Sequence, residues 1–161
     1  TYLAQSHFGA FLSILSCPQS SDVLTTIQKN DSAIGVFGIS DRDTWWINLP
    51  DHLRVFVQVP FVNKADIPTD AIGYAVGHMP LEPSGDDQTL LVVYGASESD
   101  ISTIQSVLGL NILCLSSSNE AILVQVPGFL IQENQYNMLL DQPFCDRVDC
   151  IGAFATPFQK A

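Results

Sequence analysis

Six basic side chains are all that this 161-residue sequence can offer to an anionic ligand, against 17 acidic ones. They are Arg42, Arg54, Arg147, Lys29, Lys64 and Lys160. Arginine suits carboxylates best, because its planar guanidinium donates two parallel hydrogen bonds. Arg54 opens an expected strand, where it faces either a ligand cleft or the solvent. Arg42 either forms an anion site with Trp45 and Trp46 through cation–π contacts, or is solvated beside a buried tryptophan pair.

A second candidate site lies where Gly95–Glu98 meets the start of an expected helix. Free backbone N–H groups at such a start attract a small carboxylate, whereas the simpler interpretation is that Ser97 caps the helix. Ser116–Ser118 either bind a ligand or form a polar hairpin turn. The three histidines have no acidic or cysteine partner at ligand spacing, so we expect no metal site. No glycine-rich phosphate motif is present, and we expect no cofactor.

The composition restricts the class of protein. With 47% apolar residues and 14% charged ones, the chain can form a real core and is not disordered. The formal net charge of −11 argues against nucleic acid and against anionic membrane surfaces as partners. No apolar run reaches the roughly 18 residues of a membrane-spanning helix.

The first half of the sequence is expected to form part of an α/β lobe. Helical spacing predicts a helix over Tyr2–Leu15 and a second one that Ser21 or Asp22 caps. Strands are expected over Ala33–Ile39, Leu53–Phe61 and Ala71–His78, with a short helix over Trp45–Leu49. The turn-rich segment 81–87 then indicates a boundary between 1–80 and 88–161.

The second half predicts a β-α-β-β-α-β order, which is the ferredoxin-like arrangement. The expected strands and helices, in chain order, are Thr89–Tyr94, Glu98–Leu108, Asn111–Leu115, Ala121–Val126, Asn134–Leu140 and Val148–Phe154. The predicted fold class is therefore α/β in the broad sense (α+β): part of an α/β lobe followed by a ferredoxin-type module.

Several segments, in order, resemble a known family. Gly109–Ser118, Val124–Phe129 and Val148–Phe154 are similar to strands and turns of the ACT domain that ends prephenate dehydratases. Val23–Ile39 resembles a segment of the dehydratase region itself. The whole order looks closest to bacterial chorismate mutase/prephenate dehydratase-like proteins of the alphaproteobacterial type. The resemblance implies a dehydratase-like region over 1–80, a connector over 81–87 and an ACT-like module over 88–161.

The resemblance also implies ligand-binding residues, and it shows where the chain departs from the family. Together with the residues singled out above, this gives a predicted ligand-binding set of Arg54, Thr89, Gly95, Ser97, Asn111 and Ser116. The family's catalytic Thr-Arg-Phe motif is matched at best by Thr89-Leu90-Leu91, which lacks the cation. Its Glu-Ser-Arg effector turn stands here as Ser116-Ser117-Ser118. Prephenate dehydratase turnover is therefore not expected.

Three functional hypotheses follow. The leading one is a protein related to aromatic amino acid biosynthesis that binds a small carboxylate (chorismate, prephenate or an aromatic amino acid) or acts as a regulatory region. The second is part of a chorismate mutase whose helical catalytic segment lies outside this chain. The third is a structural dimerisation module, since exposed sheet edges favour pairing into a homodimer. The start at Thr1, without Met, predicts a fragment of a longer chain, and the quiet cysteine usage predicts a cytoplasmic location.

Overall fold

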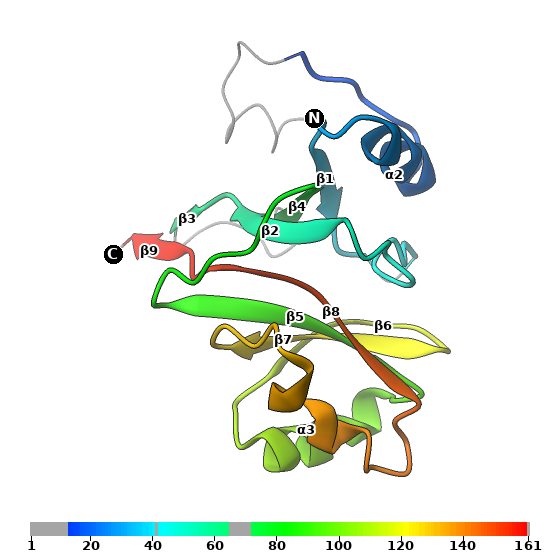
Figure 1. The fold of residues 1–161 in the computed structure, drawn as a ribbon, viewed down its shortest axis with the longest axis vertical. Coiled ribbons are helices and arrows are strands. Elements are labelled where there is room, and N and C mark those ends of the chain that lie inside the picture. The colour runs from blue at the N-terminus through cyan, green and yellow to red at the C-terminus, as the bar shows by residue number, and fades with distance from the viewer. Residues whose placement is uncertain (1–12, 41, 65–71, 161) are drawn as a thin grey trace.

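The computed structural model describes residues 13–40, 42–64 and 72–160. Within them, seven strands form one mixed sheet that curls into a half-barrel, in the order β1-β4-β2-β8-β5-β7-β6 (Figure 1). All neighbouring strands of this sheet are antiparallel except β2 and β8, which are parallel. The strands are β1 Gly35–Gly38, β2 Arg54–Val59, β4 Gly73–Gly77, β5 Asp87–Tyr94, β6 Leu113–Ser117, β7 Ala121–Pro127 and β8 Arg147–Ala155.

Two α-helices accompany the sheet in the described part of the chain. Figure 1 shows α2 (Ser20–Lys29) beside β1 and α3 (Ile101–Leu108) against β5 and β7. Short 3-10 helices cover Glu98–Asp100, Glu133–Gln135 and Asn137–Leu139, and a separate parallel ribbon pairs β3 (Val62–Lys64) with β9 (Phe158–Lys160). None of the helices described is long and apolar enough to cross a membrane.

The apolar run of β5 is buried on both faces. Successive side chains of a strand point to opposite faces of the sheet. Leu90 and Val92 accordingly belong to the cluster that contains Trp46, whereas Leu91 and Val93 pack in the cluster that contains Ile104 of α3. This arrangement explains why the strand is continuously hydrophobic rather than alternating.

The four strands of the ferredoxin-like arrangement predicted for the second half are present within the larger sheet, but its second α-helix is not. Strands β8-β5-β7-β6 are adjacent in that order, and β8 continues the sheet into β2 through the Val55–Gly152 pair. The α+β class is confirmed, and strands from both predicted parts share one sheet. β5 begins at Asp87, where the predicted connector ends, but the division of the chain into domains at 81–87 stays a prediction.

The helix predicted over Asn134–Leu140 is wrong. Two 3-10 helices occupy this segment. Its buried residues are Tyr136, which lies between the two helices, and Leu139 in the second one, and they are three positions apart. A spacing of three matches the 3.0 residues per turn of a 3-10 helix, and asparagine at 134 and 137 weakens the longer α-helix.

The helix predicted over Trp45–Leu49 is also wrong, because this segment forms a hydrogen-bonded turn in which Asn48 has a φ of +54°. Trp45 and Trp46 are buried and Arg42 is exposed, which supports the solvated interpretation of Arg42.

Two boundaries at the start of the chain need correction as well. No side chain caps α2, which begins after Gln19, so the predicted caps Ser21 and Asp22 are wrong. Of the helix predicted over Tyr2–Leu15, residues 1–12 lie outside the described residues, and 13–15 are not helical.

The hairpin between β6 and β7 is shifted relative to the prediction. β6 starts at Leu113 rather than Asn111 and includes Ser116 and Ser117, so the turn comes later, around residues 118–120.

Candidate functional site

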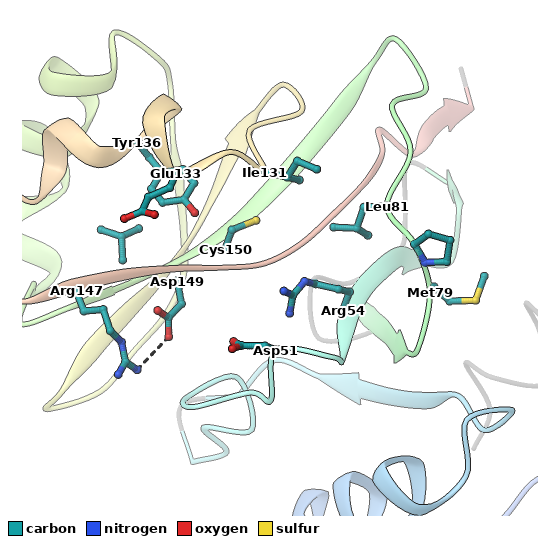
Figure 2. Close-up of a pocket in the computed structure, with 12 residues that line it drawn as sticks. Asp51, Arg54, Met79, Leu81, Ile131, Glu133, Tyr136, Arg147, Asp149 and Cys150 are labelled. Atoms are coloured by element: carbon teal, nitrogen blue, oxygen red, sulfur yellow. Dashed lines mark ion pairs between the residues drawn. The ribbon is translucent and has the colours of Figure 1, made fainter.

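A cavity of about 600 Å³ lies near the junction of β2 and β8. At this junction the strands from the first half of the chain (β1, β4 and β2) join those from the second half (β8, β5, β7 and β6). Four segments line it: the start of β2, the chain after β4 around Met79, the turns around Tyr136, and the start of β8. Figure 2 shows side chains from these segments around one open space. Because β2 and β8 are adjacent and parallel, their first residues reach the same end of the sheet, which explains why Arg54 and Arg147 share a cavity.

Arg54 is the strongest ligand-binding group in this cavity. It is half-buried, and its Nη1 donates a hydrogen bond to the carbonyl oxygen of Leu53 (3.0 Å). Among the described residues no carboxylate lies within ion-pair distance of it. Figure 2 shows the guanidinium pointing into the cavity, toward Asp149 and Cys150. A guanidinium has five N–H donors, so most of them are available to a ligand.

Tyr136 and Cys150 supply neutral polar groups to the same cavity. Burial, with the nearby negative groups adding to it, raises the pKa of Tyr136 to about 12, while Arg54 opposes the shift. Burial likewise raises the pKa of the Cys150 thiol, again against the effect of Arg54. At neutral pH the cavity therefore presents a phenol O–H donor and a protonated thiol.

Arg147 lies at the opposite side of the cavity and is held by three neighbours. Its guanidinium pairs with Asp149 (3.0 Å), donates to Oδ1 of Asn48 (2.9 Å) and lies 4.0 Å from the centroid of the Tyr94 ring. The backbone N–H of Asn48 in turn donates to the Tyr94 hydroxyl (2.9 Å). These contacts join the turn before β2 to β5 and β8.

The cavity has no arrangement typical of metal binding or nucleophilic catalysis. Across residues 13–40, 42–64 and 72–160 no group of three or more His, Cys, Asp or Glu side chains is placed to hold a metal ion. No histidine lines the cavity, so Cys150 has no imidazole base there. The chemistry that the lining supports is ion pairing and hydrogen bonding.

The other predicted ligand residues lie outside this cavity. Thr89 and Ser97 already form hydrogen bonds within the chain. Thr89 is fully buried: its Oγ1 donates to the Gly128 carbonyl (2.7 Å) and accepts from the Leu130 N–H (2.9 Å). Ser97 and Asp100 form a capping box for the 3-10 helix before α3, so capping accounts for Ser97.

Gly95, Asn111 and Ser116 are also separate from Arg54. Gly95 has a φ of +84°, and a Cβ there would collide with the Phe144 carbonyl. Asn111 is exposed between α3 and β6, while Ser116 is buried and its Oγ has no partner among the described residues. Their roles in ligand binding stay predictions.

Arg147 is the functional residue that sequence reasoning missed, since it was only counted among the cations. One signal was available. Arg147 directly precedes the strand predicted over Val148–Phe154 and is two residues from Asp149, so in an extended chain the two side chains share a face. The contacts with Asn48 and Tyr94 join residues 99 and 53 positions away, which no local pattern reveals.

Comparison with known proteins gives a likeness in fold. No family model matches the sequence, and neither does any curated protein. One solved structure, described as "GqqA- a novel type of quorum quenching acylases", is similar over 96% of this chain and 88% of its own, with a TM-score of 0.55 and 13% identity. At that identity the likeness concerns the fold alone.

These comparisons overturn the family assignment made from the sequence. The chain was expected to be a chorismate mutase/prephenate dehydratase-like protein of the alphaproteobacterial type, and that assignment is wrong: no model of any family matches, and the similar structure is described as an acylase. What remains is the fold likeness.

Proposed function

We propose that this chain binds a small carboxylate-bearing molecule in the cavity at Arg54. One observation carries the proposal: a half-buried guanidinium without an ion-pair partner among the described residues points into a space of about 600 Å³. A guanidinium removed from bulk water binds most strongly to a planar anion that accepts two of its N–H groups.

The rest of the lining supports a molecule with an apolar body. Met79, Leu81 and Ile131 line the cavity beside Arg54, and the Tyr136 hydroxyl offers a second hydrogen-bond donor. A volume of this size lies within the range of about 300–1,000 Å³ that is usual for small-molecule sites. Chorismate, prephenate and the aromatic amino acids fit this description and remain proposals, as does a cytoplasmic location.

The experiment compares phenylacetate with phenylacetamide, which has nearly the same shape but no charge. Both are added to the wild type and to the R54M variant in a thermal-shift titration, together with chorismate, prephenate and the aromatic amino acids. A ligand at 100 times its dissociation constant stabilises the fold by about 2.7 kcal/mol, which is about 5–10 °C for a chain of this length.

We expect a shift with carboxylates in the wild type that R54M removes. R42M is the matched control, because Arg42 is an exposed arginine outside the cavity. A wild type that responds to no carboxylate, or an R54M variant that responds as the wild type does, refutes the proposal.

Amide hydrolysis is a second candidate, favoured by the near full-length likeness to a structure described as an acylase. Among the lining residues, the Cys150 thiol is the group most suited to attack an amide carbonyl. Its raised pKa and the absence of a histidine from the lining argue against that role. Hydrolysis of a chromogenic N-acyl amine by the wild type, with loss of the activity in C150A, would support the acylase candidate over simple binding.

A homodimer remains a proposal of its own. β6 pairs only with β7 among the described strands, and Leu113 on β6 is 57% exposed. A free, partly apolar edge favours strand pairing with a second copy. Sedimentation velocity over a range of concentrations tests it, and a monomer at every concentration would exclude a stable dimer.

A further inference from the structure

The cavity contains more negative than positive groups, and their pairing is uneven. Arg54 and Arg147 share it with Asp51, Glu133 and Asp149. Arg147 forms an ion pair with Asp149 at 3.0 Å, which leaves Arg54, Asp51 and Glu133 as the other charged groups of the lining. Arg54 is left without a carboxylate partner among the described residues.

Arg147 is fixed in that pair by contacts that a solvent-exposed arginine usually lacks. The Tyr94 ring lies against its guanidinium, and Asn48 Oδ1 accepts a hydrogen bond from Nη2. Asn48 is itself anchored through its backbone N–H to the Tyr94 hydroxyl. These neighbours hold Arg147 beside Asp149 and reduce the entropic cost that weakens most surface ion pairs.

Asp149 and Arg54 are both close enough to Tyr136 to affect its ionisation. Both groups act on Tyr136, whose ionisation Asp149 disfavours and Arg54 favours. Figure 2 shows the Asp149 carboxylate beside Arg147 and on the side of the cavity that Arg54 faces, where the Asp51 carboxylate also lies. A carboxylate in this position that lost its partner would attract the remaining guanidinium.

We propose that Arg147 is a positioning residue for the carboxylate site: by pairing with Asp149, it prevents that carboxylate from capturing Arg54 and keeps Arg54 available to a ligand. This inference rests on the proposed function. It assigns the Arg147–Asp149 pair a role in the specificity of the site in addition to its contacts with the fold.

The test uses Cys150 as a reporter inside the cavity. Its thiolate displaces iodide from iodoacetate or iodoacetamide and forms a thioether, and the two reagents differ in charge but little in size. Peptide mass spectrometry gives the ratio of the two alkylation rates at Cys150, with Cys114 on β6 as the internal reference outside the cavity. The ratio cancels changes in thiol ionisation and accessibility, so a merely loosened structure does not alter it.

Five variants separate the explanations. R147M should lower the iodoacetate/iodoacetamide ratio at Cys150, by about fivefold at low salt if the effect is that of a partly exposed ion pair. R147M/D149N should return the ratio to the wild-type value. R147M/D146N has the same net charge as R147M/D149N but retains Asp149, so its ratio should remain as low as that of R147M. R54M and R54M/R147M should both give a low ratio at Cys150.

The outcomes distinguish the inference from the proposed function. An unchanged ratio in R147M, or equal rescue by D146N and D149N, overturns the role of Arg147 even where R54M-sensitive phenylacetate binding is intact. A ratio that R54M leaves unchanged, together with no carboxylate binding, overturns both. Asp146 is a fair control because it adjoins Arg147 in sequence but does not line the cavity.

Discussion

Two regions of this molecule were expected to bind a ligand, and they differ in what their polar groups already do. Around Gly95 and Ser97, the donors and acceptors serve the chain itself: the Gly95 N–H donates to the Glu120 carbonyl, and Ser97 bonds with Asp100. Ser117 Oγ further ties β6 to Glu98 (2.6 Å). At Arg54, in contrast, most of the guanidinium has no partner among the described residues.

The difference shows why residue type alone is a weak guide to a binding site. Serine, threonine and glycine suit a ligand loop, but the same properties make them suit turns and caps. A half-buried arginine has no comparable structural use unless a carboxylate pairs with it, because burying an unpaired charge is costly. The cavity is therefore the better candidate for a ligand-binding site.

The largest effect is expected from G152A, which disturbs the pairing of β2 with β8. A Cβ at 152 would collide with the backbone and the side chain of Val55, the residue that pairs with Gly152. Because β2 and β8 would have to separate, the free energy of unfolding should fall by about 3 kcal/mol, or about 6–12 °C in Tm. Calorimetry measures the change.

Gly38 provides the matched control, since a Cβ there meets no atom within 4 Å. G38A should change the Tm little. Carboxylate binding should weaken in G152A but not in G38A, because the cavity depends on this junction. A G152A variant with wild-type stability would contradict the close approach of β2 and β8.

Removing the charge of Arg54 directly tests which of the two regions binds the ligand. R54M should raise the dissociation constant for a carboxylate by about tenfold to a hundredfold, the effect of losing hydrogen bonds to a charged group. S97A should leave it unchanged. Isothermal titration calorimetry with phenylacetate measures both, and a larger effect from S97A would reverse the comparison.

Thr89 matches the first residue of the Thr-Arg-Phe motif, but its hydroxyl already forms two hydrogen bonds within the fold. T89V leaves the Gly128 carbonyl and the Leu130 N–H without their partner in a fully buried place. The free energy of unfolding should fall by about 2 kcal/mol, while the dissociation constant for a carboxylate should stay the same. Urea unfolding and calorimetric titration of the same sample separate the two. A changed dissociation constant at wild-type stability would restore Thr89 as a ligand residue.

The sequence predicted the strands well because burial imposes a simple pattern on them. β5, β7 and β8 lie within one or two residues of the expected ranges, and Glu98–Leu108 is helical as expected. The Asn134–Leu140 segment was misassigned because its apolar residues fit a 3-10 turn as readily as an α-helix. β3 and β9 were too short to give a pattern.

The site was only half predictable, for a different reason. Arg54 could be singled out because it is a rare cation at the start of a strand. Its neighbourhood could not, because Arg147 reaches the same cavity only through the parallel pairing of β2 with β8, 93 positions further along. The family resemblance failed because strings such as Asn111–Leu115 followed by three serines describe any strand that ends in a polar turn.

The smallest effect concerns Tyr136, whose pKa is raised to about 12 by burial in the cavity wall and by nearby negative groups. Since the fold disfavours the phenolate, the unfolded chain loses this proton first, near the ordinary pKa of 10.0. The contribution of Tyr136 to stability is therefore fully present below pH 10 and is lost as the pH rises toward 12. Urea unfolding at pH 9, 10.5 and 11.5 should show a steeper decline for the wild type than for Y136F.

The comparison with Y136F removes the effects of the other tyrosines, including Tyr74, whose pKa burial also raises. Carboxylate binding should persist up to about pH 10, because the Tyr136 hydroxyl still carries its proton there. Parallel stability curves for the two proteins, with Tyr136 absorbance titrating at the ordinary value, would mean that water reaches the wall freely. The charge of Arg54 would then be screened, and its advantage over the Gly95–Ser97 region would be smaller than the geometry indicates.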